Sequence, residues 1–429
     1  MEKLAIDGGP AAAARRTGRP HPKIGIEEFL SIARRFGFSQ EALARIAAAV
    51  SEEDLIGGGP NLARRILAFP APAVGEEYEA LARAKFGVRH AVSLSSGTAA
   101  LHCACAAIGV GPGTEVICPA IGFLATSAAV VHAGGVPVFC DVDDSLQMDP
   151  TKVEALITER TVAIVPTHVM GSICNVGPIV ETARRHGLKV IEDCAQSPGG
   201  RYRGRYVGTI GDIGIFSVSA YKIIGGGESG LLLTDDDRLA ERAWQLAECG
   251  GLWRPDRFAP PRYEGELFVG TNYRMSELEA AVDLVQLRKL DDIVARYHHV
   301  KMRVLGQLGS HDGVAFQKLN DPDGEIGYLL RLFARTPERA QRIAAALVAE
   351  GVPASARGPE PSPDWHIYRD MYPVTLTVDP AVARCRKGDC PVADDLWTRE
   401  VTVTLDQWAS DEDSDAIARA IDKVLSALA

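Results

Sequence analysis

Residues 189–196 read KVIEDCAQ, a short apolar run that passes directly into Glu192 and Asp193. Apolar runs of this length, bounded by polar or glycine residues, are typical of buried strands. Similar runs recur between residues 91 and 234, and helical stretches separate many of them. The expected strands are Ala91–Leu94, Glu115–Cys118, Val136–Asp141, Val162–Pro166, Lys189–Glu192, Gly214–Ser217 and Gly230–Thr234. This alternation predicts an α/β fold with a seven-stranded, mainly parallel sheet sandwiched by helices.

The helices between these strands indicate where a functional site would lie. They are expected at Thr98–Ile108, Phe123–His132, Pro178–His186 and Asp236–Glu248. Gly or Pro stands near many of their ends. Sheets of this kind bind ligands in the crevice beyond the carboxyl ends of the strands. The residues that directly follow the strands are therefore the candidates for chemistry.

Outside this region the pattern is different. The first 70 residues carry helical stretches followed by Gly57–Pro60, with no recognisable chemistry, and irregular segments occur at Gly250–Gly270 and Pro353–Pro373. Further helices are expected at Ile26–Phe36, Gln40–Val50, Ser276–Leu290, Pro337–Glu350 and Glu412–Leu428. We divide the chain into an N-terminal helical segment (1–74), a large domain (75–295) and a smaller C-terminal α+β domain (296–429).

Composition and charge exclude several classes of protein. The 46% hydrophobic and 24% charged residues are those of an ordinary globular protein. Acidic residues outnumber basic ones by 56 to 46, which disfavours nucleic acid as a partner. No stretch of about 18 apolar residues is available to span a membrane, and Met1–Pro10 does not resemble a signal peptide. We therefore expect a cytoplasmic protein without a membrane partner.

The nine cysteines are scattered and lie mostly in apolar runs, so we expect them to be reduced core residues. Cys385 and Cys390 are separated by four residues, but no second pair at finger-like spacing accompanies them. This favours a structural role over a zinc site. We expect no metal.

Two acids stand at the end of the strand Lys189–Glu192. A buried carboxylate beside a pyridine nitrogen keeps that nitrogen protonated, because the opposite charges stabilise each other where the dielectric is low. Equally, Glu192 and Asp193 could simply cap the turn that follows the strand. This segment alone leaves both interpretations open.

Lys222 lies between two strands and precedes the glycines Gly225, Gly226 and Gly227. A desolvated lysine in such a loop becomes a nucleophile for carbonyl groups, whereas an exposed one is an ordinary surface charge. A phosphate-binding loop of the nucleoside triphosphatases is disfavoured, because its lysine follows the glycines. Ser96, Gly97 and Thr98 begin a helix, where backbone amides would bind an anion or the side chains would merely cap the helix.

Together these segments resemble the DegT/DnrJ/EryC1/StrS sugar aminotransferases, a family within the fold type I pyridoxal phosphate enzymes. The resemblance extends from about Gly75 to the C-terminus and implies an aspartate aminotransferase-like fold, whose large domain binds the cofactor. The motifs that carry it are SGTAAL at 96–101, PAIGFLAT at 119–126, EDCAQ at 192–196, FSVSAYK at 216–222, GESG at 227–230 and FVGTNYRMSELEA at 268–280.

The resemblance implies a role for each matched residue. Lys222 would hold pyridoxal 5′-phosphate as a Schiff base, Asp193 would pair with its ring nitrogen, and Phe123 would stack on the ring. Asn272 would reach the cofactor phosphate of a neighbouring subunit, which implies a homodimer with shared active sites. The implied cofactor-binding residues are Gly97, Thr98, Ala99, Phe123, Asp193, Gln196, Ser217, Lys222 and Asn272. Gln196 would contact the phenolic oxygen, and Thr98, Ala99 and Ser217 the phosphate.

The implied function is transfer of an amino group from L-glutamate or L-glutamine to a keto sugar, nucleotide-linked or free, or to a keto cyclitol in sugar or antibiotic biosynthesis. Lys222 argues against the deoxygenating relatives that carry His in its place. Two further functions stay open, a dehydrating or aromatising enzyme of the same family and a non-catalytic sensor or scaffold. Arg274 is a candidate for the donor carboxylate, and His168 either lines the site or is structural.

The sequence also departs from the family pattern. Gly122 replaces a threonine, Cys194 an alanine and Ser229 a glycine, and additional residues precede the first motif. These departures concern the substrate pocket and not the cofactor.

Overall fold

A seven-stranded sheet forms the centre of the computed structural model, which describes residues 3–9, 24–55, 62, 73–250, 259–358, 360–365, 386 and 388–428. The chain divides into two units, Met1–Ala73 and Val74–Ala429. In the first unit, α1 (Ile26–Ala33) and α2 (Gln40–Ala49) form as expected, and Ser39 caps α2 by accepting a hydrogen bond from the Ala42 amide. The segment Gly57–Pro60 lies outside the described residues.

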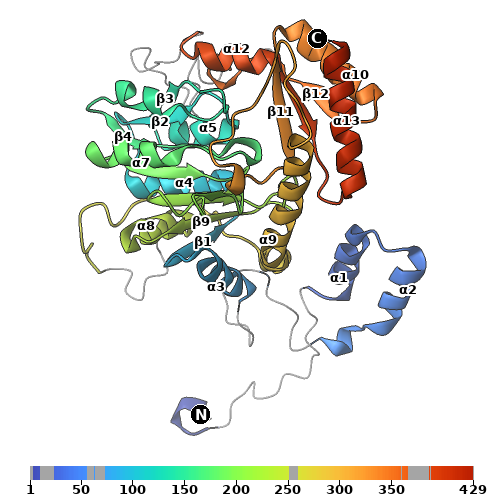
Figure 1. Cartoon of the computed structure of the whole chain (residues 1–429). Coiled ribbons are helices and arrows are strands. Elements are labelled where there is room, and N and C mark those ends of the chain that lie inside the picture. The colour runs from blue at the N-terminus through green and yellow to red at the C-terminus, as the bar shows by residue number, and fades with distance from the viewer. Residues whose placement is uncertain are drawn as a thin grey trace. The chain divides into compact units, whose positions relative to one another are not determined.

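The large sheet belongs to the second unit and has the order β1-β9-β8-β5-β4-β2-β3 (Figure 1). Its strands are β1 (His90–Leu94), β2 (Glu115–Pro119), β3 (Val136–Cys140), β4 (Thr161–Ile164), β5 (Lys189–Asp193), β8 (Ile213–Ser217) and β9 (Gly230–Thr234). All run parallel except β9, which is antiparallel to both of its neighbours. The predicted α/β class and the predicted strands are therefore confirmed.

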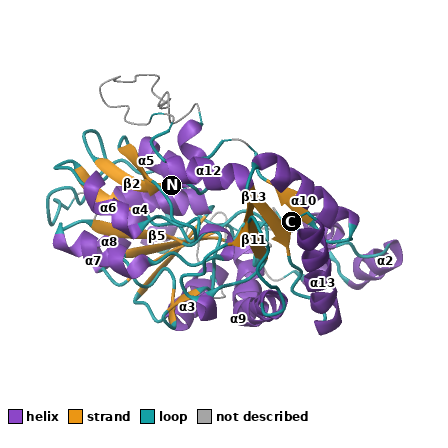
Figure 2. Ribbon diagram, turned by 45° about the horizontal axis from the view of Figure 1, so that its top comes forward, coloured by secondary structure: helices purple, strands orange, loops and turns teal. Residues whose placement is uncertain are grey.

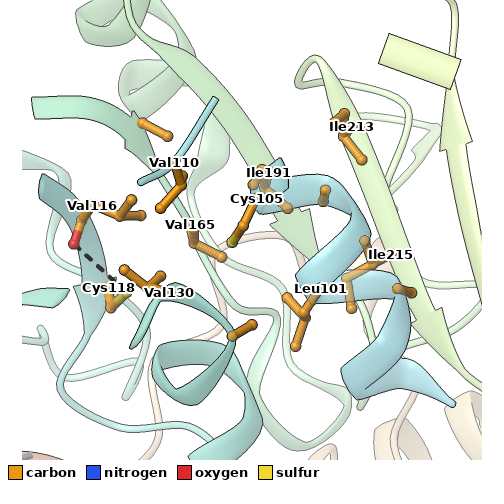
Figure 3. Packing of buried hydrophobic residues seen from close by; sticks show 14 of the residues in the cluster. Leu101, Cys105, Val110, Val116, Cys118, Val130, Val165, Ile191, Ile213 and Ile215 are labelled. Carbon is orange, nitrogen blue, oxygen red and sulfur yellow. Dashed lines mark hydrogen bonds between the residues drawn. The ribbon is translucent and has the colours of Figure 1, made fainter. Parts of the chain in front are cut away.

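Helices cover both faces of this sheet, which explains why its strands are apolar almost throughout. One face is covered by α4 (Gly97–Ile108), α5 (Leu124–His132) and α8 (Asp237–Ala247), and the other by α3 (Val74–Phe86), α7 (Val176–Arg185) and α9 (Glu277–Leu305). Side chains alternate along β5, so that Ile191 packs with Leu101 and Cys105 of α4 while Val190 faces α7 (Figure 3).

A smaller antiparallel sheet lies beside the large one (Figure 2). Its order is β10 (Val314–Phe316), β11 (Leu329–Ala334), β13 (Glu400–Thr404) and β12 (Ala354–Ala356), and α10 (Pro337–Ala349), α12 (Pro391–Arg399) and α13 (Asp411–Ala427) accompany it. Leu332, Ile343 and Ile421 share one core there. This sheet confirms the expected smaller C-terminal α+β domain. Part of the segment Pro353–Pro373 lies outside the described residues, and so does Cys385.

The helix α9 is longer than predicted, because it continues from Leu290 to Leu305 without a break. Its apolar stripe also continues: Leu287 packs under the large sheet, whereas Val300 and Val304 pack in the core of the small one. A single helix thus joins the two cores and passes through the boundary expected at residue 296. No helix in the described part of the chain has the length and apolar character needed to cross a bilayer.

Candidate active site

A cavity of about 700 Å³ opens at the carboxyl ends of β5 and β8. The loops after the strands line one side of it, and residues of the C-terminal sheet domain, including Tyr328, Thr404 and Leu405, line the other. The sequence-predicted residues that it brings together are Gly97, Thr98, Phe123, Asp193, Gln196, Ser217 and Lys222. Pockets of this size and position are where α/β enzymes hold a small-molecule ligand.

Asp193 and Lys222 are the ionisable pair of this cavity. The Asp193 carboxylate is buried and accepts hydrogen bonds from the Thr126 hydroxyl at 2.6 Å and from the Ala195 amide at 3.0 Å. Burial raises the pKa of Asp193, against the effect of these hydrogen bonds and of the Lys222 charge. Burial also lowers the pKa of Lys222, against the attraction of Asp193 and Glu228. The lysine is thereby shifted toward the neutral, nucleophilic amine.

Glu192 points to the other face of β5 and has a different role. Its Oε1 accepts the amides of Ile210 at 2.6 Å and Gly211 at 2.7 Å, and its Oε2 lies 3.3 Å from His168 Nε2. Burial alone would raise the pKa of Glu192, but the hydrogen bonds from His168 and the Gly211 amide leave that pKa lowered. Of the two acids, Glu192 holds a turn and Asp193 faces the cavity.

His168 does not line the cavity, because it lies fully buried behind β5. Its Nδ1 accepts the Cys174 amide at 3.1 Å and its Nε2 contacts Glu192. The metal-binding atoms of His168, Glu192 and Cys194 lie within 4.8 Å of one another. Both ring nitrogens of His168 and both carboxylate oxygens of Glu192 already have hydrogen-bond partners within the protein. This favours a structural role for the two residues.

The first turn of α4 lies at the cavity, where Ser96, Gly97 and Thr98 line it. Ser96 caps the helix by accepting the Ala99 amide at 3.0 Å, so this amide already has a partner. The Thr98 hydroxyl and the amides of Gly97 and Thr98, which have no carbonyl before them in the helix, are the remaining donors. A Cβ at residue 97 would lie only 2.7 Å from the Cβ of Ser217. Glycine therefore allows the helix start to approach the Ser217 hydroxyl.

Phe123 and Gln196 lie along the cavity wall. Phe123 precedes α5, and 59% of its surface is exposed. The Gln196 Oε1 accepts the amide of Met170 at 2.9 Å, and Met170 has the left-handed φ of 54°. The carboxamide nitrogen of Gln196 is then the end that can donate a hydrogen bond to a ligand.

Asn272 and Arg274 lie outside this cavity. Asn272 is exposed, and its Oδ1 accepts the amide of Arg274 at 3.2 Å. The Arg274 guanidinium is paired with the buried carboxylate of Glu248 at 3.0 Å. Its charge is therefore already balanced, which does not favour Arg274 as the group that binds a donor carboxylate.

Several cavity residues were not identified from the sequence. Thr126 lies within the PAIGFLAT segment. Its hydrogen bond to Asp193 depends on the packing of α5 beside β5, which no local motif reveals. Tyr328 belongs to the C-terminal sheet domain, and its hydroxyl donates to the Gln196 carbonyl at 2.9 Å. No local motif marks it. Further lining residues include Met170, Glu228, Tyr297, Thr404 and Leu405.

A mainly parallel sheet, a lysine and an aspartate at its carboxyl edge, and a small antiparallel-sheet domain beside the cavity together define the aspartate aminotransferase-like fold. Within that class the chain belongs to the DegT/DnrJ/EryC1/StrS aminotransferase family, whose model matches residues 73–422.

Individual relatives agree with this assignment. GDP-perosamine synthase from Caulobacter vibrioides is 43% identical over 215 residues, which are 50% of this chain and 56% of that relative. L-glutamine:2-deoxy-scyllo-inosose aminotransferase from Streptomyces fradiae is 36% identical over 79% of this chain and 83% of its own length. The crystal structure of NtdA from Bacillus subtilis with the bound cofactor PMP is similar with a TM-score of 0.68 and 27% identity, covering 83% of this chain and 78% of that one.

The contrast between the two neighbouring acids can be tested by truncation. We expect Glu192→Ala to lower the free energy of unfolding by about 3 kcal/mol, because two buried amides lose their acceptor. Asp193→Ala should cost only about 1 kcal/mol, because water in the cavity can replace the carboxylate. Unfolding in urea measures both values. Equal losses for the two variants would contradict the separate roles.

Proposed function

We propose that this protein is a pyridoxal 5′-phosphate-dependent aminotransferase that moves an amino group from L-glutamate or L-glutamine to a keto sugar or keto cyclitol. The observation that carries the proposal is the pairing of Lys222 and Asp193 across one cavity whose far end is a helix N-terminus. The names of the relatives, a perosamine synthase and a glutamine:inosose aminotransferase, support the choice of substrates.

The residues of the cavity fit this cofactor. The helix start at Gly97 and Thr98, with the Ser217 hydroxyl, offers donors for a phosphate group. Phe123 offers an exposed ring for stacking, and Gln196 a carboxamide donor for a phenolic oxygen. When bound, pyridoxal phosphate supplies an electron sink for the substrate carbon that loses its proton.

Lys222 would act as nucleophile and as proton carrier. Because burial lowers the pKa of Lys222, a larger share of the amine is neutral and able to attack a carbonyl carbon. Once an amino donor displaces it, the same amine can take a proton from the substrate carbon and return it elsewhere. Glu228, which lines the cavity and attracts the lysine, would help to keep the amine near the reacting atoms.

Asp193 would keep a pyridine nitrogen protonated. Burial raises the pKa of this carboxyl group, so it gains more from a cationic partner than an exposed carboxylate does. Thr126 and the Ala195 amide hold its two oxygens in place, and the aspartate therefore presents a fixed negative charge to the cavity.

We further propose that the functional unit is a homodimer with shared sites. Asn272 is exposed and does not line the cavity of its own chain. The residues near it in sequence include exposed apolar side chains, among them Leu267, Val269 and Leu278. Such side chains are typical of a subunit interface, across which Asn272 would reach the phosphate site of the partner.

Transamination predicts a separate half-reaction. Protein loaded with pyridoxal phosphate should convert L-glutamate or L-glutamine into its keto acid, about one equivalent per chain, without an acceptor. Asp193→Asn should slow this step about a hundredfold, because the fixed negative charge is lost. Chromatography of the keto acid, followed by a screen of keto sugars and keto cyclitols, measures both steps. An elimination product without keto acid would instead favour a dehydrating or aromatising enzyme.

Shared sites predict complementation between inactive variants. Lys222→Ala and Asn272→Ala subunits are each expected to lose activity alone. After mixing and exchange, about half of the dimers are hybrids and each hybrid has one intact site, so activity should return to about a quarter of the wild-type value. Each variant mixed with itself is the control. No recovery in exchanged dimers would contradict a shared site.

A further inference from the structure

The loop that joins Lys222 to β9 lies directly on α9. A Cβ at Gly226 would come within 2.6 Å of the Val282 side chain, and one at Gly227 within 2.8 Å of the Glu279 carboxylate. Glycine at both positions therefore permits a backbone approach that other residues would prevent. The loop is also tied to the strand end before it, because the Ala220 amide donates to the Gly227 carbonyl at 2.9 Å.

Ser229, at the end of this loop, forms a hydrogen bond with Asp283 of α9. Both side chains are fully buried. The Ser229 hydroxyl donates to Asp283 Oδ2 and lies 3.5 Å from the Val218 carbonyl, which follows β8. Within the described residues, Asp283 Oδ1 has no hydrogen-bond partner. Ser229 is also one of the positions at which this chain departs from the glycine of the family motif.

The hydrogen-bond inventory favours a neutral Asp283. The Ser229 hydroxyl has one hydrogen and two acceptors near it, the Val218 carbonyl and the Asp283 carboxylate. If Asp283 is protonated, it can donate to Ser229, and the serine hydrogen is then free for Val218. The Val218 carbonyl also accepts the Gly226 amide at 3.4 Å, so the atom left without a donor among the described residues is Asp283 Oδ1. A full negative charge shared by that buried, unpartnered oxygen is costly.

The surroundings of Asp283 are acidic as well. Glu279 precedes it by one turn of α9, Tyr78 of α3 lies near it, and Glu228 of the loop acts on Glu279. Burial raises the pKa of Asp283 to about 7, the Ser229 hydrogen bond opposes this rise, and Glu279 adds to it. A second negative charge here would repel the loop that carries Glu228 and follows Lys222.

We propose that Asp283 is a positioning residue for Lys222. Asp283, when it is protonated, holds the loop 223–229 on α9 through its hydrogen bond with Ser229. Only the role of Lys222 rests on the proposed function; the attachment of the loop to α9 does not. Loss of the Asp283 proton loosens the loop and moves Lys222 away from the position from which it reacts.

The test uses the full chain without cofactor, in Asp283→Asn, Asp283→Ala and Ser229→Gly variants. Asp292→Asn, an exposed aspartate on the same helix, is the matched control. Because the folded pKa of Asp283 is raised, the folded chain binds more protons than the unfolded chain, and stability falls as pH rises from about 4 to about 7. An asparagine at residue 283 does not titrate, so this loss of stability with rising pH should be absent from the Asp283→Asn variant. The melting temperature of Asp283→Asn should therefore rise relative to that of the wild type as the pH is raised from about 5 to about 8.

The second readout is the rate at which pyridoxal phosphate labels Lys222, trapped with borohydride and measured by mass spectrometry. Asp283→Ala and Ser229→Gly should be slower by about fivefold, the equivalent of roughly one hydrogen bond, whereas Asp283→Asn and Asp292→Asn should not be slower. A melting temperature of Asp283→Asn that keeps the wild-type pH dependence, or wild-type labelling in folded Asp283→Ala, would overturn the proposal. Absence of labelling in the wild type itself would refute the proposed function, and the melting temperatures would still decide whether Asp283 holds the loop.

Discussion

The attraction between Asp193 and Lys222 acts between two groups that the fold withdraws from water. Asp193 ends β5, and Lys222 follows β8, the neighbouring strand of the sheet. Burial raises the pKa of Asp193 and lowers the pKa of Lys222, and each partner reduces the cost of charge on the other. This balance would suit the ring of the proposed cofactor, whose nitrogen carries a proton.

Three features of the fold maintain that balance. Glu192, which neighbours Asp193 on β5, fixes the turn at Ile210 and Gly211 and so keeps the end of β5 in register with β8. The glycine at residue 97 allows α4 to bring its N-terminus against Ser217 at the cavity. The long helix α9 then connects the large sheet to the C-terminal sheet domain, whose Tyr328 contacts the Gln196 carbonyl from the opposite wall.

The large sheet was predictable because each strand is a buried apolar run and a helix or glycine turn follows many of them. The predictions failed where the signal is spread over distant residues. The strands β10 and β12 have three residues each, are incompletely buried and carry no periodicity. The second half of α9 was not predicted, although its apolar stripe continues through Ile293 to Val300 and Val304. Most cofactor-site candidates from compact motifs line one cavity, but Asn272 lies outside it. Arg274 and His168 are engaged by buried carboxylates that no local pattern reveals.

The proposed attachment of pyridoxal phosphate to Lys222 can be tested without knowledge of either substrate. Protein incubated with pyridoxal phosphate is reduced with borohydride, digested, and its peptides are weighed and sequenced by mass spectrometry. We expect one pyridoxyl group per chain, carried by the peptide that contains Lys222. A pyridoxyl group on a different lysine, or an unmodified Lys222 in folded and cofactor-treated protein, would contradict it.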